Sequence, residues 1–321
     1  MSLIWTLPLL FACGEKSPSD TANDDVTTED TATTTEPSSE TDESNEPSNE
    51  PGTEDTNAAG ISDYSVAGPY TVSSSSQSVS LSNCDSPMNI TTVLSSNNTD
   101  TTAIIAHGFF RSSANMTDWA EHFGSWGINA IVVDMCHFSD HQKNGLAIAE
   151  LAGELGISSP LFVGFSAGGL ASLVAASSAS PQGVLVLDPV DDMNSTGTTI
   201  YGQVNTTVLG LIGEPSECNS QNNSISLLQG VQADHTLRIV DADHCDFEAP
   251  TDDLCENGVL GFGACGNTQA TFSDDTIRGT IRGLGTAGLL WMSDMDADAA
   301  AWWTGAGFDN LNSQGYISAV Q

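Results

Sequence analysis

Residues 160–176, PLFVGFSAGGLASLVAA, contain the pattern that decides the fold. An apolar, strand-like run leads into Gly-Phe-Ser-Ala-Gly, and an alanine-rich, helix-like run follows it. A serine between two glycines at a strand-to-helix junction is typical of a nucleophile elbow, a strained turn that exposes the hydroxyl group to substrate. We therefore predict that Ser166 is a catalytic nucleophile; the alternative is an ordinary tight turn.

Short apolar runs alternate with helical patterns along most of the chain. The sequence predicts strands at 65–72, 88–94, 102–106, 129–134, 160–164, 183–187, 207–212 and 236–240, and helices at 116–126, 144–155, 167–178 and about 275–304. Continuous apolar strands separated by helices favour an α/β fold with a mostly parallel central sheet flanked by helices. No helical pattern separates the runs before residue 95, so we expect antiparallel strands at the N-terminal edge.

A serine nucleophile needs a base, and in this kind of fold the histidine comes last in the chain. His244 follows the strand 236–240 in the stretch IVDADHCDFE, so it emerges at the carboxyl edge of the sheet, as Ser166 does. His235 lies at the opposite end of that strand, and His107 precedes the serine in the chain. We predict His244 as the base, and we expect His107 to orient its own loop through hydrogen bonds.

The carboxylate that orients the histidine has several candidates. Asp188 ends the strand GVLVL, the next strand after the elbow, and we favour it. Glu217 lies one strand later, where the acid is placed more commonly, and Glu214 is a poorer candidate in the same loop. Asp191 and Asp192 also stay open. The plain alternative for each is a solvated carboxylate on an acidic surface.

Acyl transfer also requires hydrogen-bond donors for an oxyanion. We predict that the backbone N–H groups of Ala167 and Phe109 supply them. Phe110 and Phe165, together with the Phe109 ring, would form an apolar wall beside the serine, unless they are core residues. This chemistry requires neither a metal nor an organic cofactor.

Four stretches carry a resemblance to a known superfamily. They are AIIAHGFFRSSANMTDWAEHFGSWGINAIVVD (103–134), LFVGFSAGG (161–169), VLVLDPV (184–190) and DADHCDFE (241–248). Together they resemble the α/β-hydrolase superfamily, and HGF, GxSxGG and LDPV in this order resemble chlorophyllases and the platelet-activating-factor acetylhydrolase type. HGF and the earlier GPYTV are also similar to cutinase-like polyester hydrolases. The resemblance implies the α/β-hydrolase fold, serine esterase activity and an acid directly after the strand that follows the elbow.

The N-terminal segment differs from the rest of the chain. Residues 1–13 form a short apolar run that ends in Ala12-Cys13, which resembles a bacterial lipoprotein signal with a lipidated Cys13. A plain secretory signal is the alternative. We expect an exported, cell-envelope lipoprotein, periplasmic or on the outer surface, or otherwise a secreted protein. The lipid anchor would be its sole contact with a membrane.

Residues 14–60 are rich in Ser, Thr, Glu and Asp, and residues 14–56 contain fourteen acidic residues against one lysine. Such a segment cannot bury enough apolar surface to fold, so we predict a disordered tether before a catalytic domain at 61–321. That domain keeps 28 acidic and 5 basic residues, a net charge of −23. This charge excludes nucleic acid as a partner.

Six cysteines follow Cys13, an even number that predicts disulfides in an exported chain. We favour pairing among Cys218, Cys245, Cys255 and Cys265. The sequence contains no CxxC motif, so the cysteine spacing does not indicate a zinc site.

The sequence thus predicts a serine hydrolase that cleaves carboxylic esters through a Ser-His-Asp triad. Its substrate would be a small-molecule, lipid or polymer ester. A thioesterase, amidase or peptidase with the same triad is the nearest alternative, and an inactive surface-binding protein with the same fold is a more distant one.

Overall fold

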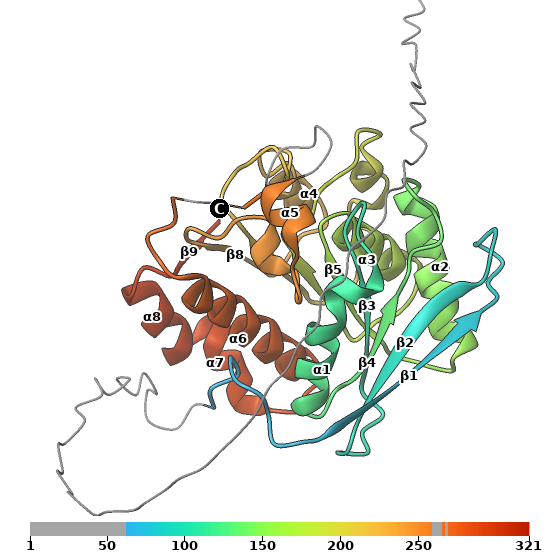
Figure 1. Ribbon diagram of the computed structural model, residues 1–321, viewed down its shortest axis with the longest axis horizontal. Coiled ribbons are helices and arrows are strands. Elements are labelled where there is room, and N and C mark those ends of the chain that lie inside the picture. The colour runs from blue at the N-terminus through green and yellow to red at the C-terminus, as the bar shows by residue number, and fades with distance from the viewer. Residues whose placement is uncertain (1–61, 259–264, 267–268, 321) are drawn as a thin grey trace, which may run out of the picture. The chain divides into compact units, whose positions relative to one another are not determined.

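A nine-stranded sheet forms the centre of the computed structural model, which describes residues 62–258, 265–266 and 269–320. The sheet and its helices give an α/β-hydrolase-like fold (Figure 1). The predicted signal segment at 1–13, its Cys13 and the predicted tether at 14–60 lie outside the described residues.

The strand order places the predicted parallel strands in the middle of the sheet. The strands are β1 (Val72–Val79), β2 (Met88–Ser95), β3 (Thr102–Ala106), β4 (Asn129–Val133), β5 (Leu161–Phe165), β6 (Gly183–Leu187), β7 (Val208–Ile212), β8 (His235–Ile239) and β9 (Ile317–Ala319). Their order is β1-β2-β4-β3-β5-β6-β7-β8-β9. Strands β3 to β8 run parallel, whereas β1 and β2 at one edge and β9 at the other are antiparallel. The predicted antiparallel N-terminal edge is confirmed.

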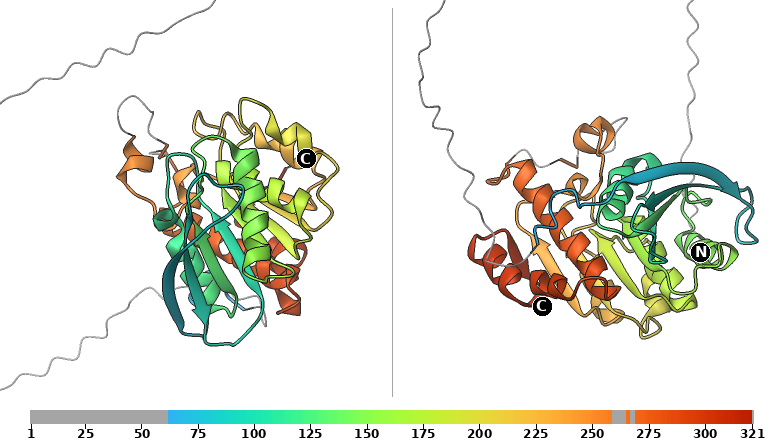
Figure 2. Two further views of the ribbon diagram at one scale, coloured as in Figure 1. Left: turned by 90° about the vertical axis from the view of Figure 1, so that its right-hand side faces the viewer. Right: turned by 90° about the horizontal axis from the view of Figure 1, so that it is seen from below.

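Helices cover both faces of the sheet (Figure 2). The α-helices of the described residues are α1 (Thr117–Ser125), α2 (His141–Glu154), α3 (Ala167–Ser178), α4 (Ser224–Gly230), α5 (Asp253–Asn257), α6 (Asp274–Met292), α7 (Ala301–Thr304) and α8 (Ala306–Ser313). Apolar side chains of α1, α6, α7 and α8 share one core cluster, and those of α2, α3 and α4 share the other. No helix among the described residues has the length and hydropathy to cross a membrane.

Strand β5 illustrates why the central strands read as unbroken apolar runs. All five of its residues are buried. Leu161, Val163 and Phe165 join the core cluster of α1 and α6, while Phe162 joins that of α2 and α3. Successive side chains of a strand point to opposite faces, so a strand covered on both faces needs apolar residues at every position.

The predicted strand at 65–72 is wrong. This segment is irregular, and the first strand is β1, which begins at Val72 and continues through a serine-rich stretch. The cause is a competing backbone contact at the end of α1. There the Tyr70 N–H donates to the Ser125 carbonyl (3.0 Å), and the Gly68 N–H donates to the Ser125 hydroxyl (2.9 Å).

The C-terminal part also differs from the sequence prediction. Instead of one helix over 275–304, α6 ends at Met292 and α7 begins at Ala301. The break contains Asp294 with a left-handed φ of 55° and Asp296, whose side chain accepts the Tyr64 hydroxyl (2.7 Å). Four further elements, α4, α5, α8 and the three-residue strand β9, have no counterpart among the predicted elements, because their runs are short or polar.

Candidate active site

Ser166 occupies the turn between β5 and α3 with φ 54° and ψ −122°. A positive φ is uncommon for a residue with a Cβ and costs about 1–3 kcal/mol, so the surrounding structure must hold it. Here the Ser166 N–H donates to the Leu187 carbonyl of β6 (3.0 Å). A Cβ on Gly168 would overlap the carbonyl oxygens of Ala106 and His107, so this glycine lets α3 approach β3. The turn has the geometry of the predicted elbow.

Three predicted residues from distant parts of the chain meet at this turn. His244 Nε2 lies 3.0 Å from Ser166 Oγ, and His244 Nδ1 lies 2.6 Å from Asp188 Oδ2. Because a carboxylate accepts hydrogen bonds, Nδ1 carries the proton and Nε2 is free to accept from the serine hydroxyl. All three side chains are buried, with Asp188 at 0% exposure. The hydrogen bonds therefore form a continuous chain from carboxylate to hydroxyl.

Asp188 is held from its other side by polar groups that follow β7. Its Oδ1 accepts from the Gly213 N–H (3.0 Å), and its Oδ2 accepts from Asn219 Nδ2 (3.1 Å). Asn219 is fully buried and also donates to the Glu214 carbonyl (2.8 Å). Asn219 was not predicted, because an amide next to Cys218 carries no distinguishing signal in the sequence.

The other candidate acids do not contact His244. Glu217 is exposed, and Glu214 forms an ion pair with Arg238 of β8. Asp191 and Asp192 accept backbone N–H groups of their own loop. Among the described carboxylates, Asp188 is the one whose oxygen is hydrogen-bonded to the His244 imidazole.

Two other histidines have non-catalytic surroundings. His107 Nδ1 donates to the Gly108 carbonyl (2.7 Å), and His107 Nε2 accepts from the Met135 N–H (3.1 Å). This arrangement requires the neutral ring, and burial lowers the pKa of His107. The prediction that His107 orients its loop is confirmed. His235 lies at the entry end of β8, with its ring near two tryptophans.

The two predicted oxyanion donors lie on segments that flank the serine. Ala167 is the first residue of α3, where a helix leaves its N–H groups without partners inside the helix. Phe109 follows Gly108, on which a Cβ would lie 3.2 Å from the Ser166 Cβ. Neither amide donates a hydrogen bond to another described residue. Both N–H groups thus have no acceptor among the described residues, on segments that adjoin Ser166.

Comparison with known proteins gives no further guide to the chemistry of this site. No model of a known protein family matches the sequence, and no curated protein matches it. The fold and the side chains of the site therefore carry the evidence for function.

Aromatic rings surround the site at two levels. Phe109 and Phe110 are 39% and 52% exposed, and their ring centroids lie 4.8 Å from that of Phe138, which is 65% exposed. Phe138 was not among the predicted site residues. Phe165 instead lies beneath the site: its ring is 1% exposed, and its centroid is 4.7 Å from the His244 ring. It supports the imidazole from the core.

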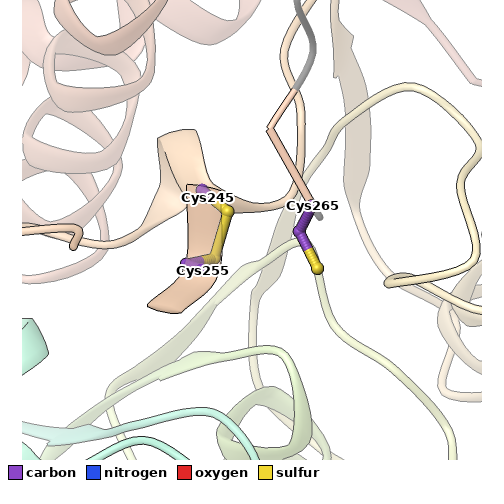
Figure 3. A group of neighbouring side chains, drawn as sticks. All are labelled: Cys245, Cys255 and Cys265. Atoms are coloured by element: carbon purple, nitrogen blue, oxygen red, sulfur yellow. A yellow bond between two sulfur atoms is a disulfide. The ribbon is translucent and has the colours of Figure 1, made fainter. Parts of the chain in front are cut away.

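Three disulfides confirm the prediction from the cysteine count. They are Cys84–Cys136, Cys218–Cys265 and Cys245–Cys255, so the favoured pairing among the last four is also confirmed. Figure 3 shows the Cys245–Cys255 bond with Cys265 beside it. The sulfur atoms of these three cysteines lie within 4.8 Å of one another, but all are used in disulfides and are not thiolate ligands. Several disulfides indicate an oxidising environment, extracellular or periplasmic.

An arginine on α6 also holds the segment that carries His244. Arg278 Nε donates to Asp246 (2.9 Å), and Arg278 Nη2 donates to Glu256 on α5 (2.7 Å). Burial and the nearby Asp243 raise the pKa of Asp246 to about 6, against the lowering effect of Arg278. The segment that carries the His244 imidazole is therefore fixed by the Arg278–Asp246 ion pair and by the Cys245–Cys255 disulfide.

Proposed function

We propose that this chain is a serine hydrolase that cleaves carboxylic esters through Ser166, His244 and Asp188. The observation that carries the proposal is the unbroken hydrogen-bond chain, 3.0 Å from hydroxyl to imidazole and 2.6 Å from imidazole to carboxylate, at a strained elbow. A buried serine, histidine and aspartate in this order have the mutual geometry that nucleophilic acyl transfer requires.

In the first step, Ser166 Oγ attacks the ester carbonyl carbon while His244 Nε2 takes the hydroxyl proton. Asp188 stabilises the imidazolium cation that forms. The carbonyl oxygen becomes an oxyanion, and the N–H groups of Phe109 and Ala167 donate to it. Collapse of the tetrahedral intermediate breaks the bond to the alcohol oxygen, which receives the proton from His244. The product of this step is an acyl-serine.

In the second step, a water molecule takes the place of the alcohol. His244 removes a proton from the water, and the resulting hydroxide attacks the acyl carbon. The second tetrahedral intermediate releases the carboxylic acid, and the proton returns to Ser166 Oγ. No redox equivalent and no group outside the chain is consumed except water.

The surroundings of the site favour an uncharged substrate with an apolar part. Phe109 and Phe110 directly follow Gly108, which adjoins Ser166, and their rings are exposed and contact the exposed ring of Phe138. The chain carries 42 acidic against 6 basic residues, so an anionic substrate would be repelled at long range. An ester with an apolar acyl or aromatic group fits both conditions. Small-molecule, lipid and polymer esters all fall within this class.

The proposal includes an export route. The signal-like segment at 1–13 supports acylation of Cys13, and residues 14–60 would then act as a tether between the membrane and the enzyme. This part of the proposal has its own test: Cys13→Ser should move the protein from the membrane fraction to the soluble fraction. If the wild-type protein is already soluble, the lipid anchor is refuted.

A fluorophosphonate probe and a series of nitrophenyl esters from acetyl to palmitoyl test the activity. The wild-type protein should be labelled at Ser166 and should hydrolyse at least part of the series. Ser166→Ala and His244→Ala should both lose this activity, because members of a triad act as a unit. His235→Ala is the matched control, since His235 lies at the opposite end of β8, and it should retain activity.

Failure of the wild-type protein to hydrolyse any ester would refute the esterase. If the probe still labels Ser166, thioesters, amides and peptides become the substrates to test. Labelling of another serine would refute the nucleophile itself. If the wild-type protein shows neither probe labelling nor ester turnover, a binding role for the hydrolase-like fold is the remaining alternative.

A further inference from the structure

The turn that carries the Phe109 N–H is strained. The Arg111 N–H donates to the Gly108 carbonyl (3.2 Å), which closes a four-residue turn with Phe109 and Phe110 at its centre. Phe110 has a left-handed φ of 59°. A bulky residue in this region costs on the order of 1–2 kcal/mol and adopts it when other contacts hold the backbone there.

The side chain of Arg111 provides such a contact. Its Nε and Nη2 donate to the two carboxylate oxygens of Glu248, the second at 2.7 Å, and Nη2 also donates to Asp252 Oδ1 (2.8 Å). The arginine side chain is 7% exposed and that of Glu248 is 0% exposed. Two parallel hydrogen bonds fix the carboxylate in both distance and plane. The guanidinium is therefore held rigidly, and so is the turn that bears it.

Glu248 lies four residues after His244, on the segment that positions the imidazole. The ion pair thus links the oxyanion turn directly to the segment of the catalytic base. A second contact reinforces the link, since Asn115 Nδ2 donates to Asp252 Oδ2 (3.1 Å) and the Ala249 N–H donates to the Asn115 carbonyl (3.0 Å). The two halves of the site are joined at these points.

Stability alone is a weak reason for this ion pair. Taking both charges out of water costs several kcal/mol per ion, and an apolar pair of similar volume is often as stable. The geometry of a bidentate pair is its distinguishing property. Arg111 is also one of only six basic residues in the chain.

We propose that Arg111 and Glu248 are positioning residues that fix the Phe109 N–H relative to Ser166 and His244. The inference rests on the proposed ester hydrolysis and adds to it the residues that assemble the oxyanion site. Neither side chain touches the reacting atoms. Their effect should therefore appear in transition-state stabilisation and leave ground-state binding almost unchanged.

The test uses Arg111→Met and compares an ester with the matching thionoester, in which sulfur replaces the carbonyl oxygen. A sulfur anion accepts hydrogen bonds poorly, so the preference for the oxygen ester measures the oxyanion site. Arg111→Met should lower kcat for the ester about 30-fold, less than the 10²–10³-fold typical of losing one donor outright, because the amide is displaced but still present. KM should change less than about threefold, and the preference for the ester over the thionoester should fall about tenfold.

Arg278→Met is the matched control. Arg278 also forms ion pairs, with Asp246 on the segment of His244, with Glu256 on α5 and with Asp274 on its own helix, but it does not bond to the oxyanion turn. The control should leave the ester preference unchanged even if its kcat falls. Arg111→Lys, which keeps the charge, should recover part of kcat and part of the preference.

The proposal is overturned if Arg111→Met keeps kcat within about twofold of the wild type, a barrier change too small for a displaced donor. An equal loss of ester preference in Arg278→Met would also overturn it. Glu248→Gln, which keeps the shape of the side chain, serves as a second variant if Arg111→Met does not fold. Unfolding of both would show that the pair holds the fold as a whole, which contradicts the proposal. Failure of the proposed function would instead appear in the wild-type protein, as absence of ester turnover.

Discussion

The carboxyl edge of the sheet and the edge strand β1 use polar side chains in opposite ways. At the carboxyl edge, Asp188, Asn219 and Glu248 are buried, and each makes at least two hydrogen bonds. In β1, five serines in eight residues are exposed, and the strand packs little against either core cluster. Polar residues thus determine a precise geometry in one region and solvate an edge in the other.

The difference has an energetic consequence. A buried polar group that loses its partner costs about 1–3 kcal/mol, and more when it is charged, because water cannot replace the lost bond. An exposed hydroxyl exchanges one hydrogen bond for another with water. Substitutions at the carboxyl edge should therefore alter function strongly, and those in β1 should hardly alter anything.

The largest effect is expected from Asp188→Asn, which should lower kcat about 10⁴-fold. The Gly213 N–H requires an acceptor at the Oδ1 position of residue 188, so the new amide group would place its own N–H₂ at the Oδ2 position, which faces His244. The imidazole would then carry its proton on Nε2 and could not accept from the serine. Steady-state kinetics on a soluble nitrophenyl ester measure the loss.

Glu217→Gln is the control for this prediction. Glu217 is exposed and does not contact His244, so kcat should change less than about tenfold, or about 1.4 kcal/mol in the barrier. The opposite ranking of the two variants would place the acid after β7 and refute the role of Asp188.

Two disulfides sharpen the comparison. Removal of Cys84–Cys136 should lower stability more, whereas removal of Cys245–Cys255 should lower activity more. Cys84 lies between β1 and β2, and Cys84–Cys136 spans 52 residues, whereas Cys245–Cys255 spans 10 and adjoins His244. Loop-closure entropy predicts a loss of about 4 kcal/mol for the first bond and about 3 kcal/mol for the second. Displacement of the imidazole should lower kcat at least about tenfold when the second bond is removed, since small misplacements are costly in catalysis.

Double serine variants of each pair, studied by guanidinium unfolding and kinetics, test this prediction. Cys84→Ser with Cys136→Ser should keep kcat within about twofold of the wild type, a change under about 0.5 kcal/mol in the barrier. If it loses as much activity as the variant without Cys245–Cys255, the disulfide next to His244 has no special effect on the site.

The same contrast explains what the sequence could predict. The parallel strands were predicted within a residue or two because burial on both faces demands continuous apolar runs, as in β5. β1 was missed because pairing on one side and solvent on the other place no such demand on its serines. Ser166, Asp188 and His244 were predicted because strand ends converge at one edge. The roles of Asn219, Arg111 and Glu248 were not predicted. Their partners lie far away in the chain and follow no local pattern.

His122, a buried residue of α1, supplies a pH test. Its Nε2 donates to the Tyr64 carbonyl (2.9 Å), and burial lowers its pKa from 6.5 to about 4. The unfolded chain therefore binds more protons than the folded one as pH falls from 6.5 toward 4, and stability falls across this window. The loss assigned to His122 between pH 7 and pH 5 is about 2 kcal/mol.

His122→Gln keeps a side-chain donor but cannot titrate. Burial also lowers the pKa values of His107 and His141, so the wild-type protein should lose additional stability at pH 5. The difference between wild type and variant isolates the contribution of His122, measured by guanidinium unfolding at both pH values. Equal losses in the two proteins would show that His122 does not control this slope.

The smallest effect is expected from Ser74→Ala in β1. Ser74 pairs with Val93 of β2 through the backbone, and its side chain is exposed. The variant keeps the backbone pairing and removes a hydroxyl that water already solvates, so the free energy of unfolding should change less than about 0.5 kcal/mol.

The exposed serines of β1 instead favour solubility: an apolar edge strand is open to pairing with another chain, and solvated serines reduce that tendency. Ser74→Val should therefore lower solubility while stability stays nearly constant, as light scattering and unfolding would show. A loss above about 1 kcal/mol in Ser74→Ala would mean that β1 is partnered as closely as the carboxyl edge, and the contrast between the two regions would fail.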